Sequence, residues 1–152
     1  MTTEQIMKAV KGYQSRTVIV TGGEPTLHNL TELVESLHSN GYRVHLETNG
    51  TNNPDSHFDW ITCSPKLSPL VKTNEDCQFD VHLSLLELAD EVKIVNYSGI
   101  IDKLDWIECN FRTRNLFLQP CSCENIKETL EWVLMNPEWR LSLQTHKLIN
   151  IP

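Results

Sequence analysis

The chain has 152 residues, a formal net charge of −7 and 39% hydrophobic residues. A chain of this length and composition is expected to fold as one globular domain, which excludes a disordered or fibrous protein. It holds no apolar run of the roughly 18 residues that a membrane helix needs, and its first residues do not form a signal peptide. We therefore expect a soluble cytoplasmic protein with no membrane partner. The acidic excess argues against direct binding of nucleic acid through a basic face.

The cysteines are odd in number and irregularly spaced, standing at Cys63, Cys77, Cys109, Cys121 and Cys123. No two of them form a Cys-x-x-Cys pair, so the spacing indicates neither a disulfide framework nor a familiar zinc site. The thiolates at 121 and 123 would be an incomplete ligand set for a metal ion. We interpret this pair as small, half-buried residues and expect no metal ligand in the chain.

Six short β-branched or apolar runs alternate with helical patterns along residues 1–152. They predict strands near 17–21, 42–47, 60–63, 91–95, 115–119 and 139–144. Most of these runs recur about every 25 to 30 positions, close to the repeat of a βα unit. The third run follows the second so closely that little room remains for a helix between them. This order predicts an α/β fold with a parallel sheet, open or part-closed as a barrel.

The intervening segments carry helix signals. Apolar residues spaced by three and four predict helices over 27–37 and 126–134. Asn40-Gly41 favours the end of the first of these helices. At the start of the chain, a capping box of Thr2 with Gln5 predicts one more short helix.

Small and polar residues follow most of the predicted strands. Ligand sites of parallel α/β folds lie at the carboxyl ends of the strands, so these residues are expected to meet along one rim. This rim is a candidate site before any family is considered. It is made of Thr21–Pro25, Glu47–Thr51, Cys63–Lys66, Gln119–Ser122 and Gln144–Lys147.

The first rim segment has two interpretations. Gly22 and Gly23 allow the backbone to approach a ligand, and the Glu24 carboxylate suits an ammonium group. Alternatively, the segment is a tight turn that opens a helix, with Glu24 at its positive end and Pro25 in its first turn.

Other rim residues are equally open to two interpretations. Ser64-Pro65-Lys66 offers a hydroxyl and a cation to a carboxylate or a ribose, but Ser-Pro is also a common strand exit. Glu47 needs a partner if it points into a barrel. His146 taken alone is more typical of a structural histidine than of a ligand or base.

In combination, these segments resemble a known family. The chain contains in order Thr-Gly-Gly-Glu-Pro-Thr, Glu-Thr-Asn-Gly-Thr, Ser-Pro-Lys, Asp-Glu-Val-Lys, Leu-Gln-Pro and Gln-Thr-His-Lys. This series resembles the 7-carboxy-7-deazaguanine synthase family of radical S-adenosylmethionine enzymes from about Thr2 to the last residue. The resemblance implies a single domain, 1–152, that forms the carboxyl-terminal part of an incomplete parallel (β/α) barrel.

The resemblance also implies an activity. The family converts 6-carboxy-5,6,7,8-tetrahydropterin to 7-carboxy-7-deazaguanine with loss of ammonia, a lyase reaction of queuosine biosynthesis and thus of tRNA modification. Its cofactors are S-adenosylmethionine, a 4Fe-4S cluster and Mg²⁺. Relatives suggest a homodimer for the complete protein and a flavodoxin-type electron donor.

Site residues follow by position in the family's motifs. The resemblance places the cofactor S-adenosylmethionine against Gly22, Gly23, Glu24, Ser64, Pro65, Lys66, Gln119, Pro120, Cys121 and Ser122. It places the pterin against Thr21, His146 and the terminal carboxylate of Pro152.

One part of the family's pattern is absent from the sequence. The cluster ligands of the family form a Cys-x3-Cys-x2-Cys loop after its first strand, followed by an Asp-Thr whose threonine meets Mg²⁺, and neither occurs here. We expect a truncated chain that lacks that strand, leaves a sheet edge exposed, contributes no catalytic residue and is inactive alone, since a cluster needs thiolates. The alternative is a degenerate paralogue that acts as a binding or regulatory module.

Overall fold

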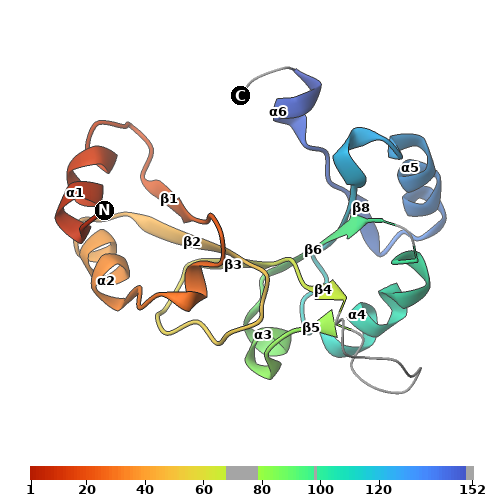
Figure 1. The fold of residues 1–152 in the computed structure, drawn as a ribbon, viewed down its shortest axis with the longest axis horizontal. Helices are drawn as coiled ribbons and strands as arrows, with labels where there is room; N and C mark the ends of the chain where they lie inside the picture. Colours follow the sequence, from red (N-terminus) through yellow and green to blue (C-terminus); the bar gives the residue numbers. More distant parts are fainter. Residues whose placement is uncertain (68–78, 98, 150–152) are drawn as a thin grey trace.

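The computed structural model describes residues 1–67, 79–97 and 99–149. It contains a six-stranded sheet in the order β1-β2-β3-β6-β7-β8, and each neighbouring pair is parallel. The sheet curves into an open half-barrel (Figure 1), which confirms the predicted fold class. Its strands are β1 (Thr17–Val20), β2 (Arg43–Thr48), β3 (Trp60–Cys63), β6 (Glu91–Asn96), β7 (Leu116–Pro120) and β8 (Trp139–Leu141).

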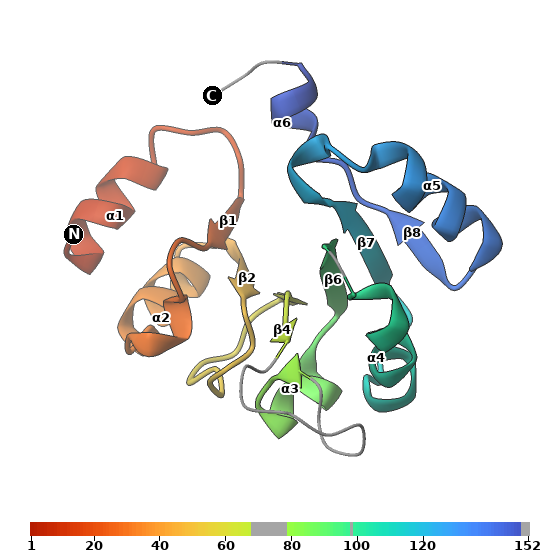
Figure 2. The ribbon, with the colours of Figure 1, turned by 45° about the vertical axis from the view of Figure 1, so that its right-hand side comes forward.

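Helices α1 to α5 lie on the convex side of the sheet, whereas α6 stands apart from them, and the concave side is open (Figures 1 and 2). None of the described helices is long and apolar enough to cross a membrane. A short antiparallel pair, β4 (Lys66–Leu67) and β5 (Phe79–Asp80), stands apart from the main sheet. The helices are α1 (Thr3–Val10), α2 (Thr31–Ser39), α3 (Leu83–Leu88), α4 (Leu104–Asn110), α5 (Ile126–Met135) and α6 (Thr145–Leu148), with short 3₁₀ turns η1 (Pro25–Leu27), η2 (Ile101–Lys103) and η3 (Cys121–Cys123).

The amino-terminal helix begins as predicted. The backbone N–H of Gln5 donates to the Thr2 hydroxyl at 3.3 Å, and the Thr2 N–H donates to the Gln5 side chain at 3.0 Å. This reciprocal capping box satisfies two of the amide groups that a helix start leaves unpaired. β1 follows α1 and forms one edge of the sheet, where Ile19 is 57% exposed. β1 is thus an edge strand of the described sheet.

Most predicted boundaries agree with the structure to within one residue, and two differ by more. The helix expected over 27–37 begins only at Thr31, because Pro25–Leu27 forms a separate 3₁₀ turn and His28 is extended. That helix ends as predicted, at Asn40 and then Gly41 with φ +77°. The last strand ends at Leu141 rather than near 144, since a short helix follows at Thr145.

The face of α5 that turns inward also differs from the apolar pattern. Thr129 is fully buried, whereas Leu130 and Leu134 are exposed. The Thr129 hydroxyl accepts a hydrogen bond from Asn96 at 2.9 Å and donates one to the Asn125 carbonyl at 2.8 Å. These bonds satisfy a polar group at a buried position.

The core fills the convex side of the sheet. Because strand side chains alternate between faces, every second residue of a strand points toward the helices. In β2 these are Val44 and Leu46, which are fully buried and belong to the same core as Val34 and Leu37 of α2. The residues between them face the concave side, where β2, β6, β7 and β8 present His45, Glu47, Glu91, Lys93, Val95, Phe117, Gln119 and Arg140.

Candidate binding site at the carboxyl ends of the strands

Glu24 joins the end of β1 to the end of β2. Its Oε1 accepts hydrogen bonds from the hydroxyls of Thr26 and Thr48, both at 2.6 Å, and from the Thr26 N–H at 3.1 Å. Its Oε2 accepts from the Asn49 N–H at 2.7 Å. The structure thus confirms the turn interpretation, because Glu24 caps η1. A carboxylate oxygen with one partner still has room to accept a second, so Oε2 remains able to bind an ammonium group.

These hydrogen bonds also set the charge of Glu24. Partial burial raises its pKa, but the donors Thr26, Thr48 and Asn49 stabilise the carboxylate and bring the pKa below the ordinary 4.5. Glu24 is therefore a fixed negative charge at the rim.

The two glycines before Glu24 present bare backbone to solvent. Gly22 has φ +97° and Gly23 has φ +55°, and a Cβ built at either position meets nothing within 4 Å. The surface above them is open, and glycine is the residue that adopts such φ values at least cost. This arrangement fits the predicted close approach of a ligand to Gly22 and Gly23.

Ser64, Pro65 and Lys66 extend the same rim from the end of β3. The Ser64 N–H donates to the Thr48 carbonyl at 2.8 Å, which links the ends of β2 and β3. The Lys66 ammonium donates to the Ser64 hydroxyl at 3.0 Å, and desolvation lowers the pKa of Lys66, against a smaller opposite effect of Cys63. Pro65 is buried. The structure thus brings three predicted rim segments together through hydrogen bonds around Thr48.

The other half of the rim lies on β7 and η3. Gln119 is half-buried on the concave face and Pro120 is buried. Ser122 has φ +47°, a left-handed conformation that is uncommon for a residue with a side chain. The Cys121 N–H donates to the Asn125 side chain at 2.8 Å, and Asn125 donates to the Asn96 carbonyl at 2.9 Å. This loop is therefore tied to the end of β6.

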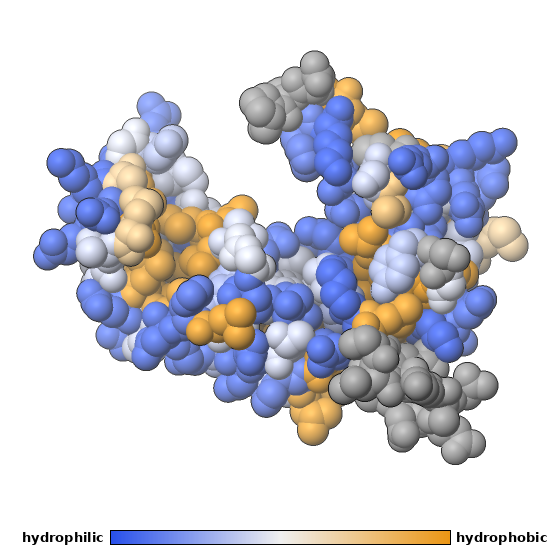
Figure 3. Space-filling model, viewed as in Figure 1, coloured by the Kyte–Doolittle hydropathy of each residue, from blue (hydrophilic) through white to orange (hydrophobic). Residues whose placement is uncertain are grey.

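The predicted pterin residues are more scattered. Thr21 is exposed directly after β1, and His146 is exposed on α6. Helix α6 stands across the open concave side from α1 and β1 in both views (Figures 1 and 2). Pro152 lies outside the described residues. In the space-filling view, the surface between these parts is hollowed, and its floor is largely blue and white (Figure 3).

The floor of this hollow carries charges to which the sequence pattern assigned no function. Lys93 Nζ lies 3.6 Å from an oxygen of Glu47 and 3.6 Å from an oxygen of Glu91. Glu47 thus has the partner that its position was expected to require. Lys93 was missed as a site candidate, although one signal pointed to it, namely that Glu91 and Lys93 place two charged residues on the same face of a strand with a buried apolar face.

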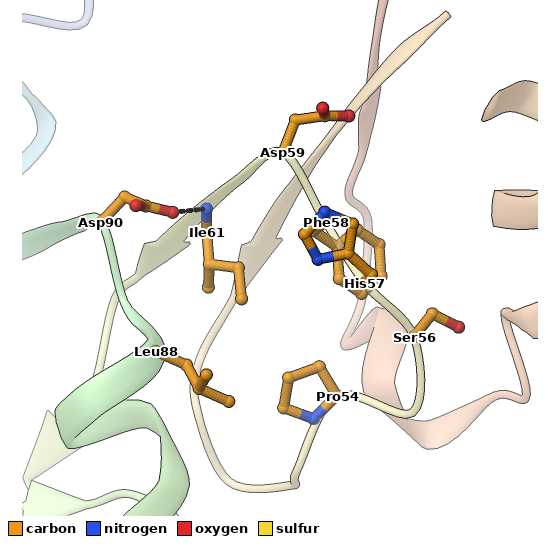
Figure 4. A pocket seen from close by; sticks show the side chains of 8 residues that line it. All are labelled: Pro54, Ser56, His57, Phe58, Asp59, Ile61, Leu88 and Asp90. Carbon is orange, nitrogen blue, oxygen red and sulfur yellow. Dashed lines mark hydrogen bonds between the residues drawn. The ribbon is translucent and has the colours of Figure 1, made fainter.

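A cavity of about 430 Å³ lies at the opposite end of the strands (Figure 4). Its wall includes Asp59 and Asp90, which precede β3 and β6. Asp90 accepts from the Ile61 N–H at 2.8 Å, and Asp59 accepts from the Val44 N–H at 2.7 Å. Both carboxylates therefore satisfy backbone amides beside the strand starts. Because ligands of parallel sheets bind at carboxyl ends, we favour the rim over this cavity.

Relatives of known name identify the family of this chain. No protein-family model matches the chain. A 7-carboxy-7-deazaguanine synthase from Bacteroides thetaiotaomicron is 41% identical over 151 residues, which cover 99% of this chain and 74% of that protein. The enzyme of the same name from Haemophilus influenzae is 34% identical and covers 97% and 71%. The chain belongs to the 7-carboxy-7-deazaguanine synthase family.

A solved relative supports the same assignment at the level of structure. The crystal structure of QueE from Escherichia coli matches with a TM-score of 0.77 at 30% sequence identity. The match covers 95% of this chain and 64% of that chain, so the chain spans less than two thirds of the solved relative. The half-barrel is therefore the fold of a 7-carboxy-7-deazaguanine synthase relative, as the motifs predicted.

Membership of this family of radical S-adenosylmethionine enzymes implies an iron–sulfur cluster. The described residues do not fit one. Cys63 is buried in the core, Cys109 is exposed on α4, and Cys121 lies on η3. Burial raises the pKa of the Cys63 thiol to about 12, and the Glu24 carboxylate adds to the rise against a smaller effect of Lys66. Within residues 1–67, 79–97 and 99–149, no three His, Cys, Asp or Glu side chains gather where a metal ion could bind. The rim offers instead an open glycine backbone beside the fixed Glu24 carboxylate.

Proposed function

We propose that this chain supplies the S-adenosylmethionine rim and the substrate face of a 7-carboxy-7-deazaguanine synthase. Such a synthase converts 6-carboxy-5,6,7,8-tetrahydropterin to 7-carboxy-7-deazaguanine with loss of ammonia. The observation that carries the proposal is the network around Glu24, which ties the ends of β1 and β2 together beneath the open Gly22-Gly23 backbone. A network of this kind holds a binding surface in shape before the ligand arrives.

Each part of the rim has a role in this proposal. Gly22 and Gly23 offer backbone N–H groups to the methionine end of S-adenosylmethionine, and Glu24 Oε2 accepts from its ammonium group. Ser64 and Lys66 face its ribose or carboxylate. Bound S-adenosylmethionine, given one electron by a reduced iron–sulfur cluster, would supply the radical chemistry that removes a substrate hydrogen. The remaining contacts come from Pro65, Gln119, Pro120, Cys121 and Ser122.

The pterin would occupy the concave side between the rim and α6. Thr21 and His146 stand on either side of that space, and the carboxylate of Pro152 is proposed to join them. The half-buried floor provides fixed charges in a partly desolvated setting, where polar contacts orient a ligand more strongly than in water.

We further propose that the cluster ligands come from chain that is not part of this sequence. Thiolates hold iron–sulfur clusters, and the cysteines at 63, 109 and 121 stand on three separate elements. Residues 1–152 alone would then bind ligands without turnover. The Mg²⁺ ion would likewise need ligands from outside these residues.

Fusion with a relative's amino-terminal segment tests this function. The cluster-binding segment of the Bacteroides thetaiotaomicron relative is placed before residue 1, the cluster is reconstituted anaerobically, and a flavodoxin or dithionite provides electrons. We expect 5′-deoxyadenosine, ammonia and 7-carboxy-7-deazaguanine. The control replaces the cluster cysteines of the added segment by alanine and should form none of them. A fusion that assembles its cluster but leaves S-adenosylmethionine intact would contradict the proposal and favour a degenerate, non-catalytic paralogue.

A further inference from the structure

Asn125 stands immediately before α5 but does not cap it. An asparagine at this position usually accepts a hydrogen bond from an N–H of the first helical turn, and the Asn125 side chain makes no such bond. Its oxygen instead accepts from the Cys121 N–H at 2.8 Å, and its nitrogen donates to the Asn96 carbonyl at 2.9 Å. The side chain therefore joins the loop after β7 to the end of β6 rather than serving its own helix.

Two buried residues hold Asn125 from behind. The Thr129 hydroxyl donates to the Asn125 carbonyl at 2.8 Å and accepts from the Asn96 side chain at 2.9 Å. Thr129 is fully buried, and Asn96 is 3% exposed. The three residues thus form a closed ring of hydrogen bonds. Because hydrogen bonds in a buried network reinforce one another, this ring holds Asn125 in one position.

The loop that Asn125 holds contains a backbone conformation that needs support. Ser122 is exposed and has φ +47° and ψ +24°, a left-handed conformation that costs free energy in a residue with a side chain. Such conformations persist only where their surroundings fix them, and they gather at ligand sites. The Cys121 N–H is held by Asn125, and the Cys121 carbonyl accepts from the Glu124 N–H at 2.9 Å. Both polar backbone groups of the residue before Ser122 are therefore fixed.

This loop belongs to the part of the rim that faces S-adenosylmethionine in the proposed function. We propose that Asn125 is a positioning residue, whose side chain fixes the backbone of Cys121 and Ser122 in the shape that S-adenosylmethionine contacts. In this role Asn125 acts through the loop and not by contact with the cofactor. The inference rests on the proposed function and adds to it a residue that lies outside the rim segments themselves.

A purely structural role makes a different prediction. If Asn125 only helped α5 to begin, serine would preserve that role, because serine is as favourable as asparagine before a helix. Serine is shorter, however, and its single hydroxyl cannot reach both Cys121 and Asn96. Asn125→Ser therefore keeps the helix start and removes the tie to the loop. Asn125→Asp keeps an oxygen that accepts from Cys121 and adds a negative charge, which the start of a helix favours.

Amide NMR of residues 1–152 gives two measurements for each variant. The first is hydrogen exchange of the Cys121 amide without ligand, and the second is the dissociation constant of S-adenosylmethionine from the shift changes. The variants are Asn125→Ser, Asn125→Ala and Asn125→Asp. Asn136→Ala is the matched control, since the Asn136 side chain donates to the Trp132 carbonyl at 2.8 Å at the other end of α5. Circular dichroism melting curves show which variants fold.

We expect Asn125→Ser to melt close to the unmodified chain, to exchange its Cys121 amide rapidly and to bind S-adenosylmethionine about tenfold more weakly, the effect of about one hydrogen bond. Asn125→Ala should show the same loss of affinity with a lower melting temperature. Asn125→Asp should keep the protected Cys121 amide and most of the affinity. Asn136→Ala should melt at a lower temperature but bind normally.

Two results would overturn the role of Asn125. One is normal binding, or a Cys121 amide that stays protected, in a folded Asn125→Ser variant. The other is an equal loss of binding in Asn136→Ala, which would show a general effect of α5. In both cases the unmodified chain still binds S-adenosylmethionine, and the proposed function stands. If the unmodified chain shows no saturable binding, the proposed function fails, and this inference fails with it.

Discussion

The hydroxyl of Thr48 lies 2.6 Å from Oε1 of Glu24 and donates a hydrogen bond to it. The two residues are 24 positions apart in the chain and stand at the ends of neighbouring parallel strands. The same hydroxyl accepts from the Gly50 N–H at 3.0 Å. Thr48 thus couples the β1 turn to the β2 turn and sets the shape of the rim.

Replacing Thr48 by valine should remove this coupling with little change in shape. We expect the free energy of unfolding to fall by about 1–3 kcal/mol, because a carboxylate and a buried amide each lose a partner. Urea denaturation measures the change. Thr51→Val is the control, since the Thr51 hydroxyl bonds to the side chain of Asn52 and not to Glu24. Equal losses in both variants would contradict a special role for Thr48.

The charge on Glu24 predicts how stability depends on pH. Its pKa is lower in the folded chain than the ordinary 4.5, so the folded state favours the carboxylate. This stabilisation is present above pH 4.5 and is lost as the pH falls through the lower, folded-state pKa. Compared with Glu24→Gln, the unmodified chain should therefore be more stable at pH 7, with a gap that closes below pH 4.5. Denaturant titrations across this range measure the gap, and a gap that widens in acid would contradict the assignment.

Gly50 should tolerate no side chain. It has φ +83°, and a Cβ at this position would lie 2.6 Å from Cys63 Sγ and 3.1 Å from Val81 Cγ2. We expect Gly50→Ala to destabilise the chain by about 2–4 kcal/mol, the sum of backbone strain and overpacking. Gly41→Ala separates the two effects, because Gly41 has φ +77° but open space around it.

The clash at Gly50 also predicts a compensating substitution. Adding Cys63→Ala to Gly50→Ala removes the sulfur atom and should recover part of the stability, although Cys63→Ala alone destabilises a fully buried position. Thermal melting of the single and double variants gives the coupling between the two sites. Additive losses would show that contact with the Cys63 sulfur does not limit the size of the residue at position 50.

Cysteine reactivity should differ sharply between two sites. Burial, together with the Glu24 carboxylate, raises the pKa of Cys63 to about 12, while Cys109 is exposed on α4. Because the thiolate is the reactive form, iodoacetamide at pH 8 should alkylate Cys109 in the folded chain and leave Cys63 unmodified until denaturant is added. Peptide mass spectrometry measures both sites. Equal alkylation rates under native conditions would contradict the burial of Cys63.

Local sequence patterns predict the strands well because each strand must bury one face. Alternation in Arg43–Thr48 places Val44 and Leu46 in the core, and the structure confirms that strand. The face of α5 is harder to predict, because Thr129 is buried through hydrogen bonds to residues far away in sequence. No local pattern shows that Asn96 will face it.

The site likewise contains residues that local motifs predict and residues that only the fold brings together. Motif positions predict Gly22, Gly23 and Glu24, and the open glycine backbone fits that prediction. The partners of Glu24 are not predictable in this way, since Thr48 and Asn49 reach it only through the pairing of β1 with β2. The bridge from Lys93 to Glu47 likewise depends on the sheet order, which places β3 between their strands.

The most direct test of the account is an amide NMR titration of residues 1–152 with S-adenosylmethionine. We predict saturable shift changes at Gly22, Gly23 and Ser122, with smaller changes around His57 and Leu88 at the opposite end of the sheet. Gly23→Asn, which keeps the left-handed backbone but fills the open space, should weaken these changes, whereas Gly41→Asn should not. Shifts confined to His57 and Leu88, or the absence of saturable shifts, would contradict the assignment of the rim as the S-adenosylmethionine site.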